Sequence, residues 1–303
     1  MRTLRFHEYG DPAEVLRLED AEPPRPGPGQ VRIAVETCGL TPADWALCGG
    51  LFAGELPRGI GLEVSGTVDA VGEGVTGVEI GDPVLGPAPF LGPTAGASGQ
   101  AVLDIWFPRP AGLDPAHAAA LPMAVETAYR GLADLGVTAG TTLLVSGAGT
   151  TVGFAAVQIA KRLGAEVIAT AGETYADALR ATGAEVTGYG EGLADRVKAL
   201  AGGPIDLVLD LAPRGTALPE LVKTVTAPDR VLTQSDLAGA GKLGVRLSSG
   251  PMRNDVLGEY AQLAAEGRFS IPIAAVYPVD DWRTALERSR SGHAHGKLVL
   301  RIG

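Results

Sequence analysis

The sequence has few cysteines, fewer basic than acidic residues, and no long hydrophobic run. Its two cysteines, Cys38 and Cys48, cannot form a disulfide framework or a zinc lobe built from four cysteines. The 25 Lys and Arg residues are outnumbered by 35 Asp and Glu, and the net charge of -10 repels phosphate backbones, so we expect no nucleic-acid partner. No apolar run approaches the roughly 20 residues of a membrane helix, and the N-terminus lacks the apolar segment of a secretory signal. We therefore expect a cytoplasmic protein that binds no membrane.

The composition predicts a globular protein of two domains. Hydrophobic residues make up 46% of the 303 residues and charged residues 20%, which is enough to bury a large core. In the N-terminal third, short β-branched runs separated by Gly and Pro predict strands of a β-rich domain at Gln30–Glu36, Glu63–Val71 and Asp82–Leu85. Four prolines between residues 23 and 28 predict an extended loop before the first strand.

From about Leu121 the sequence alternates between apolar strands and amphipathic helices. Six strands are predicted, at Thr142–Ser146, Glu166–Thr170, Glu185–Thr187, Asp206–Asp210, Arg230–Thr233 and Gly244–Leu247. Their nearly continuous Val, Ile and Leu content indicates a doubly wound parallel sheet with helices on both faces, of which Val152–Leu163 is the clearest.

The C-terminal segment reads differently from the sheet before it. After a predicted helix at 256–266, the run Ile271–Ile302 is again β-like, so we expect the chain to re-enter its first domain. The expected fold class is α/β, with a β-rich domain formed by 1–121 and 268–303 and the doubly wound sheet in 122–267.

A glycine-rich turn joins the first apolar strand of the sheet to its first long helix. Glycine has no Cβ, so backbone N–H groups and the helix N-terminus can approach a pyrophosphate there. The third glycine lies one residue later than in the usual fingerprint, and an ordinary tight turn is the alternative. The predicted dinucleotide site comprises Gly147, Gly149, Thr150, Thr151, Val152 and Gly153. The two threonine hydroxyls are expected to donate hydrogen bonds to phosphate oxygens.

Several separate motifs occur in a recognisable order along the chain. They are GPGQVRI at 27–33, GLTPADW at 39–45, GLEVSGTV at 61–68, VGEGVTGVEIGD at 71–82, LPMAVETAYR at 121–130 and GKLVL at 296–300. Together they resemble the zinc-independent quinone oxidoreductase branch of the medium-chain dehydrogenase/reductase superfamily. The resemblance implies a GroES-like catalytic domain, a Rossmann domain, and a nicotinamide site in the cleft between them. It also favours a homodimer formed through a sheet edge, which we place at Gly244–Leu247.

The resemblance also bears on zinc. Zinc-dependent relatives have cysteine where Thr41 stands and histidine where Leu62 stands, so we expect no catalytic metal. Without this Lewis acid, an alcohol or simple carbonyl is a poor substrate, whereas a quinone or enone is already electron-poor. We expect NAD(P)H-dependent reduction of a quinone or enone. One alternative is an enoyl-thioester or polyketide enone reductase, and another is a non-catalytic dinucleotide-binding protein, either a sensor or crystallin-like.

Three residues are predicted at the catalytic centre. Thr41 offers a hydroxyl where the family usually has asparagine. Asp44 either orients the nicotinamide ribose or a site water, or is a helix N-terminal carboxylate. Thr127 either lies near the nicotinamide or caps a helix. Some enone-reducing relatives have a proton-donating tyrosine near Leu51, which itself cannot donate.

Two further charged residues are expected to be structural. Glu63 is predicted to hold a hydrogen-bond network beneath the former zinc position rather than to take part in the chemistry. Lys297 is predicted to be a solvated strand residue, with a cofactor contact as the alternative. The four histidines have no spacing suited to a metal site.

Cofactor choice depends on the ends of the second and third strands of the sheet. Tyr189 matches a family tyrosine that contacts the adenosine-side phosphate. Glu173 stands near the position where an acid accepts from the ribose 2′-hydroxyl and repels a phosphate, although it can also simply open the next helix. The branch favours NADPH, with NADH as the alternative. Thr170, Thr174 and Arg180 are the candidate partners of a 2′-phosphate.

Overall fold

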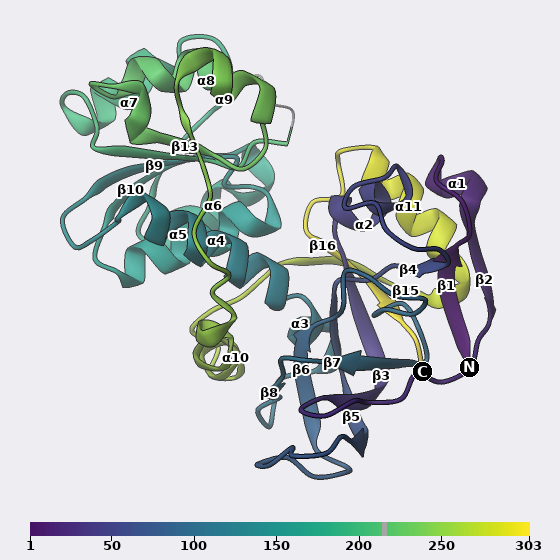
Figure 1. Cartoon of the computed structure of the whole chain (residues 1–303). Helices are drawn as coiled ribbons and strands as arrows, with labels where there is room; N and C mark the ends of the chain where they lie inside the picture. The colour runs from purple at the N-terminus through teal and green to yellow at the C-terminus, as the bar shows by residue number, and fades with distance from the viewer. Residues whose placement is uncertain (214–216) are drawn as a thin grey trace. The chain divides into compact units, whose positions relative to one another are not determined.

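The computed structural model describes residues 1–213 and 217–303 and divides into two compact units. The first unit comprises Met1–Met123 and Asn254–Gly303, and the second comprises Ala124–Arg253. Figure 1 shows strands predominating in the first unit, whereas the second has a central sheet with helices on two sides. The expected α/β fold class is confirmed.

The first unit is built on a seven-stranded sheet in the order β15-β16-β3-β5-β6-β8, with β7 paired to β3. These strands are β3 (Val31–Leu40), β5 (Glu63–Val71), β6 (Pro83–Pro87), β7 (Gln100–Leu103), β8 (Phe107–Pro108), β15 (Ile273–Pro278) and β16 (Lys297–Arg301). The three strands predicted in the N-terminal third are present, and residues 21–30 form the expected loop. β16 pairs antiparallel with β3, so the last strand completes a sheet that begins near the N-terminus.

A smaller sheet and short helices surround this one. The small sheet has the order β2-β1-β4 and comprises β1 (Arg2–Phe6), β2 (Leu16–Asp20) and β4 (Arg58–Gly59). The helices of this unit are α1 (Pro12–Val15), α2 (Pro42–Cys48), α3 (Pro115–Ala119), α10 (Leu257–Ala265) and α11 (Trp282–Arg290), with 3-10 turns at Asn254–Val256 and Val279–Asp281. Of these, α1, α2 and α11 contribute buried residues to the hydrophobic core formed by the strands.

Two predictions for the C-terminal segment need correction. The run 271–302 is not wholly β, because α11 interrupts it with buried Trp282, Ala285 and Leu286 at helical spacing. The expected boundary at residue 268 assigned α10 to the Rossmann domain, whereas α10 belongs to the first unit. It packs against β8 so closely that a Cβ on Gly258 would lie 3.0 Å from the Phe107 ring.

The second unit contains the predicted parallel sheet in the order β11-β10-β9-β12-β13-β14. Its strands are β9 (Thr142–Ser146), β10 (Glu166–Thr170), β11 (Glu185–Thr187), β12 (Leu207–Asp210), β13 (Val231–Thr233) and β14 (Arg246–Leu247). The order reverses between β9 and β12, and open α/β sheets bind ligands beyond the carboxyl ends of the strands at such a switch point.

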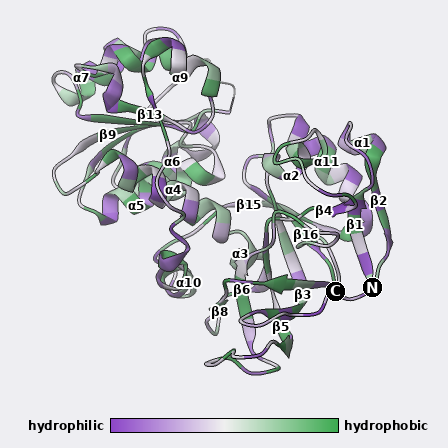
Figure 2. Cartoon of the chain, viewed as in Figure 1, coloured by the Kyte–Doolittle hydropathy of each residue, from purple (hydrophilic) through white to green (hydrophobic). Residues whose placement is uncertain are grey.

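Helices cover both faces of this sheet. They are α4 (Pro122–Leu135), α5 (Thr151–Arg162), α6 (Glu173–Ala181), α7 (Leu193–Ala201), α8 (Leu218–Leu221) and α9 (Leu237–Leu243), with 3-10 turns at Val222–Thr224 and Pro228–Arg230. Leu144, Ile168 and Val208 pack with α7, α8 and α9, whereas Leu209 on the opposite face meets α4. Figure 2 shows the hydrophobic colouring concentrated on strands such as β9 and β13, as two-sided burial requires.

Strand β14 is the edge of this sheet, and both of its residues are exposed. This is the edge at which we predicted dimerisation, and the homodimer stays a prediction. Within the described residues, no helix has the length and apolar character needed to cross a membrane.

Candidate active site

The glycine turn between β9 and α5 is held by its own backbone and one threonine. Gly147 has φ 75, a left-handed conformation that favours glycine. Thr150 is the N-cap of α5, where its Oγ1 accepts from Gly153 N at 3.0 Å and donates to Gly147 O at 2.9 Å. The Thr150 hydroxyl proton is therefore already engaged, and its predicted donation to phosphate is wrong for this arrangement. Thr151 and Val152 open the helix, so their backbone N–H groups lie in its first turn.

The glycines of the turn differ in the space around them. A Cβ on Gly153 would lie 2.2 Å from Gly147 O, so this glycine allows helix and turn to pack closely. Among the residues that the structure describes, a Cβ on Gly149 would meet only the Tyr175 ring, at 3.7 Å. Gly149 thus borders open space in front of the helix N-terminus, where backbone N–H groups and the helix dipole favour an anion.

A hollow of about 420 Å³ lies beyond the ends of β10 and β11. It is lined by Ala171, Gly172, Glu173, Ala176, Arg180, Val186, Thr187, Gly188 and Tyr189. The structure thus brings together two predicted cofactor residues, Glu173 and Tyr189. Glu173 also opens α6, as the alternative interpretation expected, and its contact with the ribose stays a prediction.

The wall that carries Tyr189 is fixed by an arginine that sequence reasoning missed. Arg196 donates to Thr187 Oγ1 at 3.2 Å and to Gly188 O at 3.0 Å. Tyr189 itself is 74% exposed and so remains available to a ligand. Thr170, predicted as a phosphate partner, is instead buried and accepts a hydrogen bond from Gly147 N at 3.0 Å. That prediction was wrong, because Thr170 helps to hold the turn.

Asp44 is a buried structural acceptor at the start of α2. Its Oδ2 accepts from Thr41 N at 2.6 Å and Thr41 Oγ1 at 2.9 Å, and its Oδ1 accepts from Gly61 N at 2.8 Å. Since Asp44 is fully buried, direct contact with a nicotinamide ribose or a site water is not open to it, and the helix N-terminal interpretation is confirmed. Desolvation raises the pKa of Asp44 to about 6. Thr41 is partly exposed and is oriented by Asp44.

Thr41 and Leu62, which the resemblance places at two zinc-ligand positions, differ in exposure: Thr41 is partly exposed and Leu62 is fully buried. Next to Leu62, Glu63 pairs with Lys297, and its Oε2 accepts from Met123 N at 2.8 Å. The network predicted for Glu63 is confirmed. Lys297 was predicted to be solvated, which is wrong: it is 2% exposed, because its strand β16 lies between β15 and β3.

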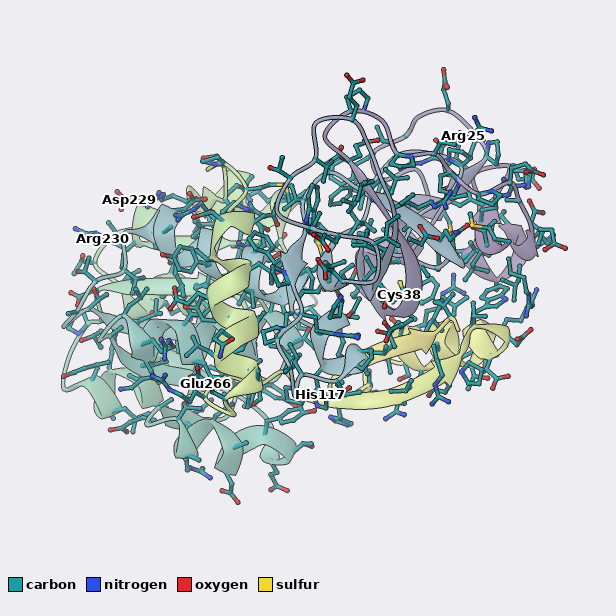
Figure 3. All side chains as sticks on the ribbon, turned by 90° about the horizontal axis from the view of Figure 1, so that it is seen from below. Arg25, Cys38, His117, Asp229, Arg230 and Glu266 are labelled. Carbon is teal, nitrogen blue, oxygen red and sulfur yellow. The ribbon has the colours of Figure 1, made fainter. Side chains whose placement is uncertain are left out.

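Cys38 shares this buried polar region. Its side chain is fully buried within the first unit, where Figure 3 labels it. Burial and the nearby Asp44 and Glu63 carboxylates raise the pKa of its thiol well above the ordinary value, so it is a poor nucleophile. Among residues 1–213 and 217–303, no three His, Cys, Asp or Glu side chains form a group able to hold a metal ion.

Thr127 lies inside α4, five residues after the helix begins, so the helix-cap alternative is wrong. Its backbone carbonyl accepts from Gln234 Nε2 at 3.0 Å, which connects α4 to the segment after β13. Sequence reasoning also missed Asp210, which is buried at the end of β12 and accepts from Thr233 Oγ1 at 2.9 Å. Burial raises the pKa of Asp210. An acidic residue that ends an otherwise apolar strand was the available signal.

Comparisons with known proteins agree with this arrangement. Residues 27–102 match the model of the alcohol dehydrogenase GroES-like domain, and residues 163–300 match that of the zinc-binding dehydrogenase. The chain is 34% identical over 296 residues to the spectinabilin polyketide synthase system protein NorB of Streptomyces orinoci. That match includes 90% of this chain but 13% of NorB.

Solved structures resemble the chain over its whole length. A quinone oxidoreductase from Coxiella burnetii has a TM-score of 0.85 at 27% identity, with 100% of this chain and 99% of that one covered. A cobalt- and zinc-bound thermostable alcohol dehydrogenase from Pyrobaculum aerophilum has a TM-score of 0.81 at 30% identity, with the same coverage.

Proposed function

Because the chain belongs to the medium-chain dehydrogenase/reductase superfamily, we propose that it reduces a quinone or another conjugated carbonyl compound with NAD(P)H and without catalytic zinc. The observation that carries the proposal is the glycine turn at the sheet switch point, combined with Thr41 and Leu62 at positions where zinc-dependent relatives have zinc ligands. The similarity to a quinone oxidoreductase supports it.

The second unit supplies the residues for the dinucleotide. Gly149 and the first N–H groups of α5, those of Thr151 and Val152, would hold the pyrophosphate. Glu173 would hold the adenosine ribose, and Tyr189 would contact the adenosine-side phosphate. The open side of Gly149 fits a pyrophosphate because no backbone atom of the described part of the chain occupies the place of its missing Cβ. When bound, the dinucleotide supplies the hydride. Thr127 remains our proposed contact of the nicotinamide.

Thr41 and Asp44 would supply the proton. Addition of hydride at carbon leaves negative charge on the oxygen of the acceptor. While Asp44 is ionised, Thr41 Oγ1 donates to Asp44 Oδ2 at 2.9 Å. Once Asp44 is protonated, this hydrogen bond reverses, and Thr41 can donate its Oγ1 proton to the acceptor oxygen as it takes the proton from Asp44. In this role Thr41 is the catalytic residue, and Asp44 is a positioning residue that carries one proton, which it regains from solvent through the partly exposed Thr41.

The proton relay predicts a specific pH profile. Asp44, with a pKa of about 6, holds a proton below that pH and loses it above, so kcat/KM is expected to fall as pH rises through about 6. The hydrogen bonds from Thr41 and Gly61, and Lys297 to a smaller extent, oppose the shift by favouring the carboxylate, and desolvation outweighs them. Thr41→Val should remove the inflection while leaving Asp44 in place, and Asp44→Asn should also remove it. An inflection that persists in Thr41→Val would contradict the relay.

The hollow contains opposing charges that bear on cofactor choice. Glu173 repels a 2′-phosphate, whereas Arg180, which pairs with Asp177 at 2.8 Å, can attract one. We propose NADPH as the reductant, as the branch favours, with NADH as the alternative.

Glu173→Gln is expected to raise kcat/KM for NADPH relative to NADH by about tenfold, because one carboxylate beside a phosphate is removed. Steady-state rates with both cofactors measure this ratio. Glu166→Gln is a matched control. Glu166 is the first residue of β10, whereas Glu173 lies beyond the other end of that strand. An unchanged ratio in Glu173→Gln would show that the hollow does not bind the adenosine ribose.

The function is tested by following cofactor oxidation with a panel of ortho-quinones, naphthoquinones and enones, with and without a metal chelator. We expect oxidation only when an electron-poor acceptor is present, and no effect of the chelator. The polyketide synthase relative supports the alternative of an enoyl-thioester reductase, which holds if an acyl thioester outcompetes the quinones. Tight cofactor binding without turnover on any acceptor would instead indicate the non-catalytic alternative.

A further inference from the structure

Asp210 is a buried carboxylate in the middle of the parallel sheet. It is the last residue of β12, where it lies opposite Ser146 of β9 and Thr233 of β13. Its side chain is fully buried. The glycine turn begins directly after Ser146, and a Cβ on Gly147 would lie 2.7 Å from Ala212 N. Asp210 therefore lies next to the turn, at the switch point where such sheets bind ligands.

The hydrogen bonds around Asp210 fit an ionised carboxylate. Its Oδ1 accepts from Ala212 N at 3.3 Å, and its Oδ2 accepts from Thr233 Oγ1 at 2.9 Å and from Ser235 Oγ at 3.4 Å. Thr233 Oγ1 itself accepts from two backbone N–H groups, each at 3.2 Å, so its own proton is directed to Asp210. Burial raises the pKa of Asp210, and these donors oppose that rise by stabilising the charged form.

Asp210 differs from other buried carboxylates in having no cation beside it. Glu63 pairs with Lys297, and Glu126 pairs with Arg130. Among residues 1–213 and 217–303, no Lys, Arg or His side chain forms an ion pair with Asp210. The negative potential of Asp210 is therefore not cancelled locally, and in a dry interior it acts strongly on any charge that arises nearby.

The sheet order places Asp210 on the side of the nicotinamide. The hollow that we assign to the adenosine ribose lies beyond β10 and β11, and the turn that we assign to the pyrophosphate follows β9. Strands β10 and β13 lie on the two sides of β9 (Figure 1), with β12 between β9 and β13. The other half of a dinucleotide held in this way extends over β12 and β13.

Hydrogen bonds connect Asp210 to the proposed contact of the nicotinamide. Gln234, the first residue after β13, donates from its backbone N to Asp210 O at 3.1 Å. Its side-chain Nε2 donates to Thr127 O at 3.0 Å. The end of β12 and the Thr127 segment of α4 are thus held to one another through a single residue.

We propose that the Asp210 carboxylate stabilises the oxidised nicotinamide and so favours departure of the hydride, an inference that rests on the proposed function. As hydride leaves C4 of the reduced nicotinamide and bonds to the acceptor carbon, two electrons pass to the acceptor, and the ring changes from neutral to positively charged. The acceptor oxygen gains the negative charge and takes its proton from Thr41. A fixed carboxylate without a counter-ion favours the new positive charge through its field, without touching the ring.

Calorimetric titration with NADP⁺ and NADPH, and with NAD⁺ and NADH, measures this effect without turnover. In Asp210→Asn the oxidised form should lose about tenfold in affinity relative to the reduced form, the order expected when one buried charge is removed. The two forms share the adenosine, the second ribose and the phosphates, so structural damage to the turn would weaken both equally. An unchanged ratio of the two affinities in Asp210→Asn would overturn the proposal.

Two control variants separate the charge of Asp210 from its structural role. Asp206→Asn removes an exposed carboxylate just before β12, at the opposite end of the strand, where it accepts from Thr142 N at 2.8 Å. It should leave the ratio unchanged, and a shift as large as that in Asp210→Asn would contradict a local effect. Thr233→Val removes a donor to Asp210 but keeps the carboxylate, so it should change the affinity for both forms by the same factor.

A second neutral variant guards against failure of Asp210→Asn to fold. Asp210→Ser also removes the charge and keeps a hydroxyl that can accept from Ala212 N, so it should give the same change in ratio. If the wild type binds both forms but reduces no acceptor, the proposed function fails, and the ratio still tests Asp210. If the wild type binds neither form, this inference is overturned together with the dinucleotide site.

Discussion

Lys297→Met is expected to lower the free energy of unfolding by about 3–5 kcal/mol, because it leaves a buried carboxylate without its counter-ion. Glu63 is fully buried, and Lys297 is the cation that pairs with it. Urea unfolding of both proteins measures the difference. Arg301→Met, at the exposed end of the same strand, should change stability by less than about 0.5 kcal/mol.

The double variant Lys297→Met/Glu63→Gln gives an independent check. Removing both charges should recover much of the loss, since the cost comes from the unpaired charge rather than from lost packing. A Lys297→Met protein within about 1 kcal/mol of the wild type would contradict the buried ion pair.

Gly149→Val is expected to weaken cofactor binding by at least ~2 kcal/mol, about thirtyfold, with little change in melting temperature. The added side chain would enter the space we assign to the pyrophosphate, while its Cβ would meet only the Tyr175 ring, at 3.7 Å, within 1–213 and 217–303. Calorimetric titration and thermal unfolding give the two quantities separately.

Gly153→Val is the matched comparison within the same turn. Its Cβ would lie 2.2 Å from Gly147 O and 2.7 Å from Ala148 Cα, so both stability and affinity should fall, stability by about 3 kcal/mol. Wild-type affinity in Gly149→Val would show that this turn is not the phosphate site.

The sequence predicted the parallel sheet closely because its strands are buried on both faces and are therefore apolar throughout. The bounds of β9, β10 and β11 agree with the prediction residue for residue. Helix α11 was not predicted because few apolar residues mark its helical spacing, and because it lies in a segment that begins and ends with strands.

The environments of charged residues were harder to predict than the elements that carry them. Lys297 looks like a surface residue in sequence, and only the strand order, with β16 between β15 and β3, buries it. Asp44 similarly reads as a site carboxylate, yet Gly61, 17 residues away, closes over it through a hydrogen bond. By contrast, Glu173 and Tyr189 were predicted separately, and parallel pairing of β10 with β11 brings them to one hollow.

The central claim is that a hydride passes from the nicotinamide to a carbon of an electron-poor acceptor. The most direct measurement incubates the protein with an enone and NADPH carrying deuterium at the transferring position of C4, then locates the label in the product by mass spectrometry. The account predicts one deuterium on the β-carbon of the enone, the alkene carbon farther from the carbonyl group, with or without a chelator. Product without deuterium at that carbon, or no product from any enone or quinone with either cofactor, would contradict it.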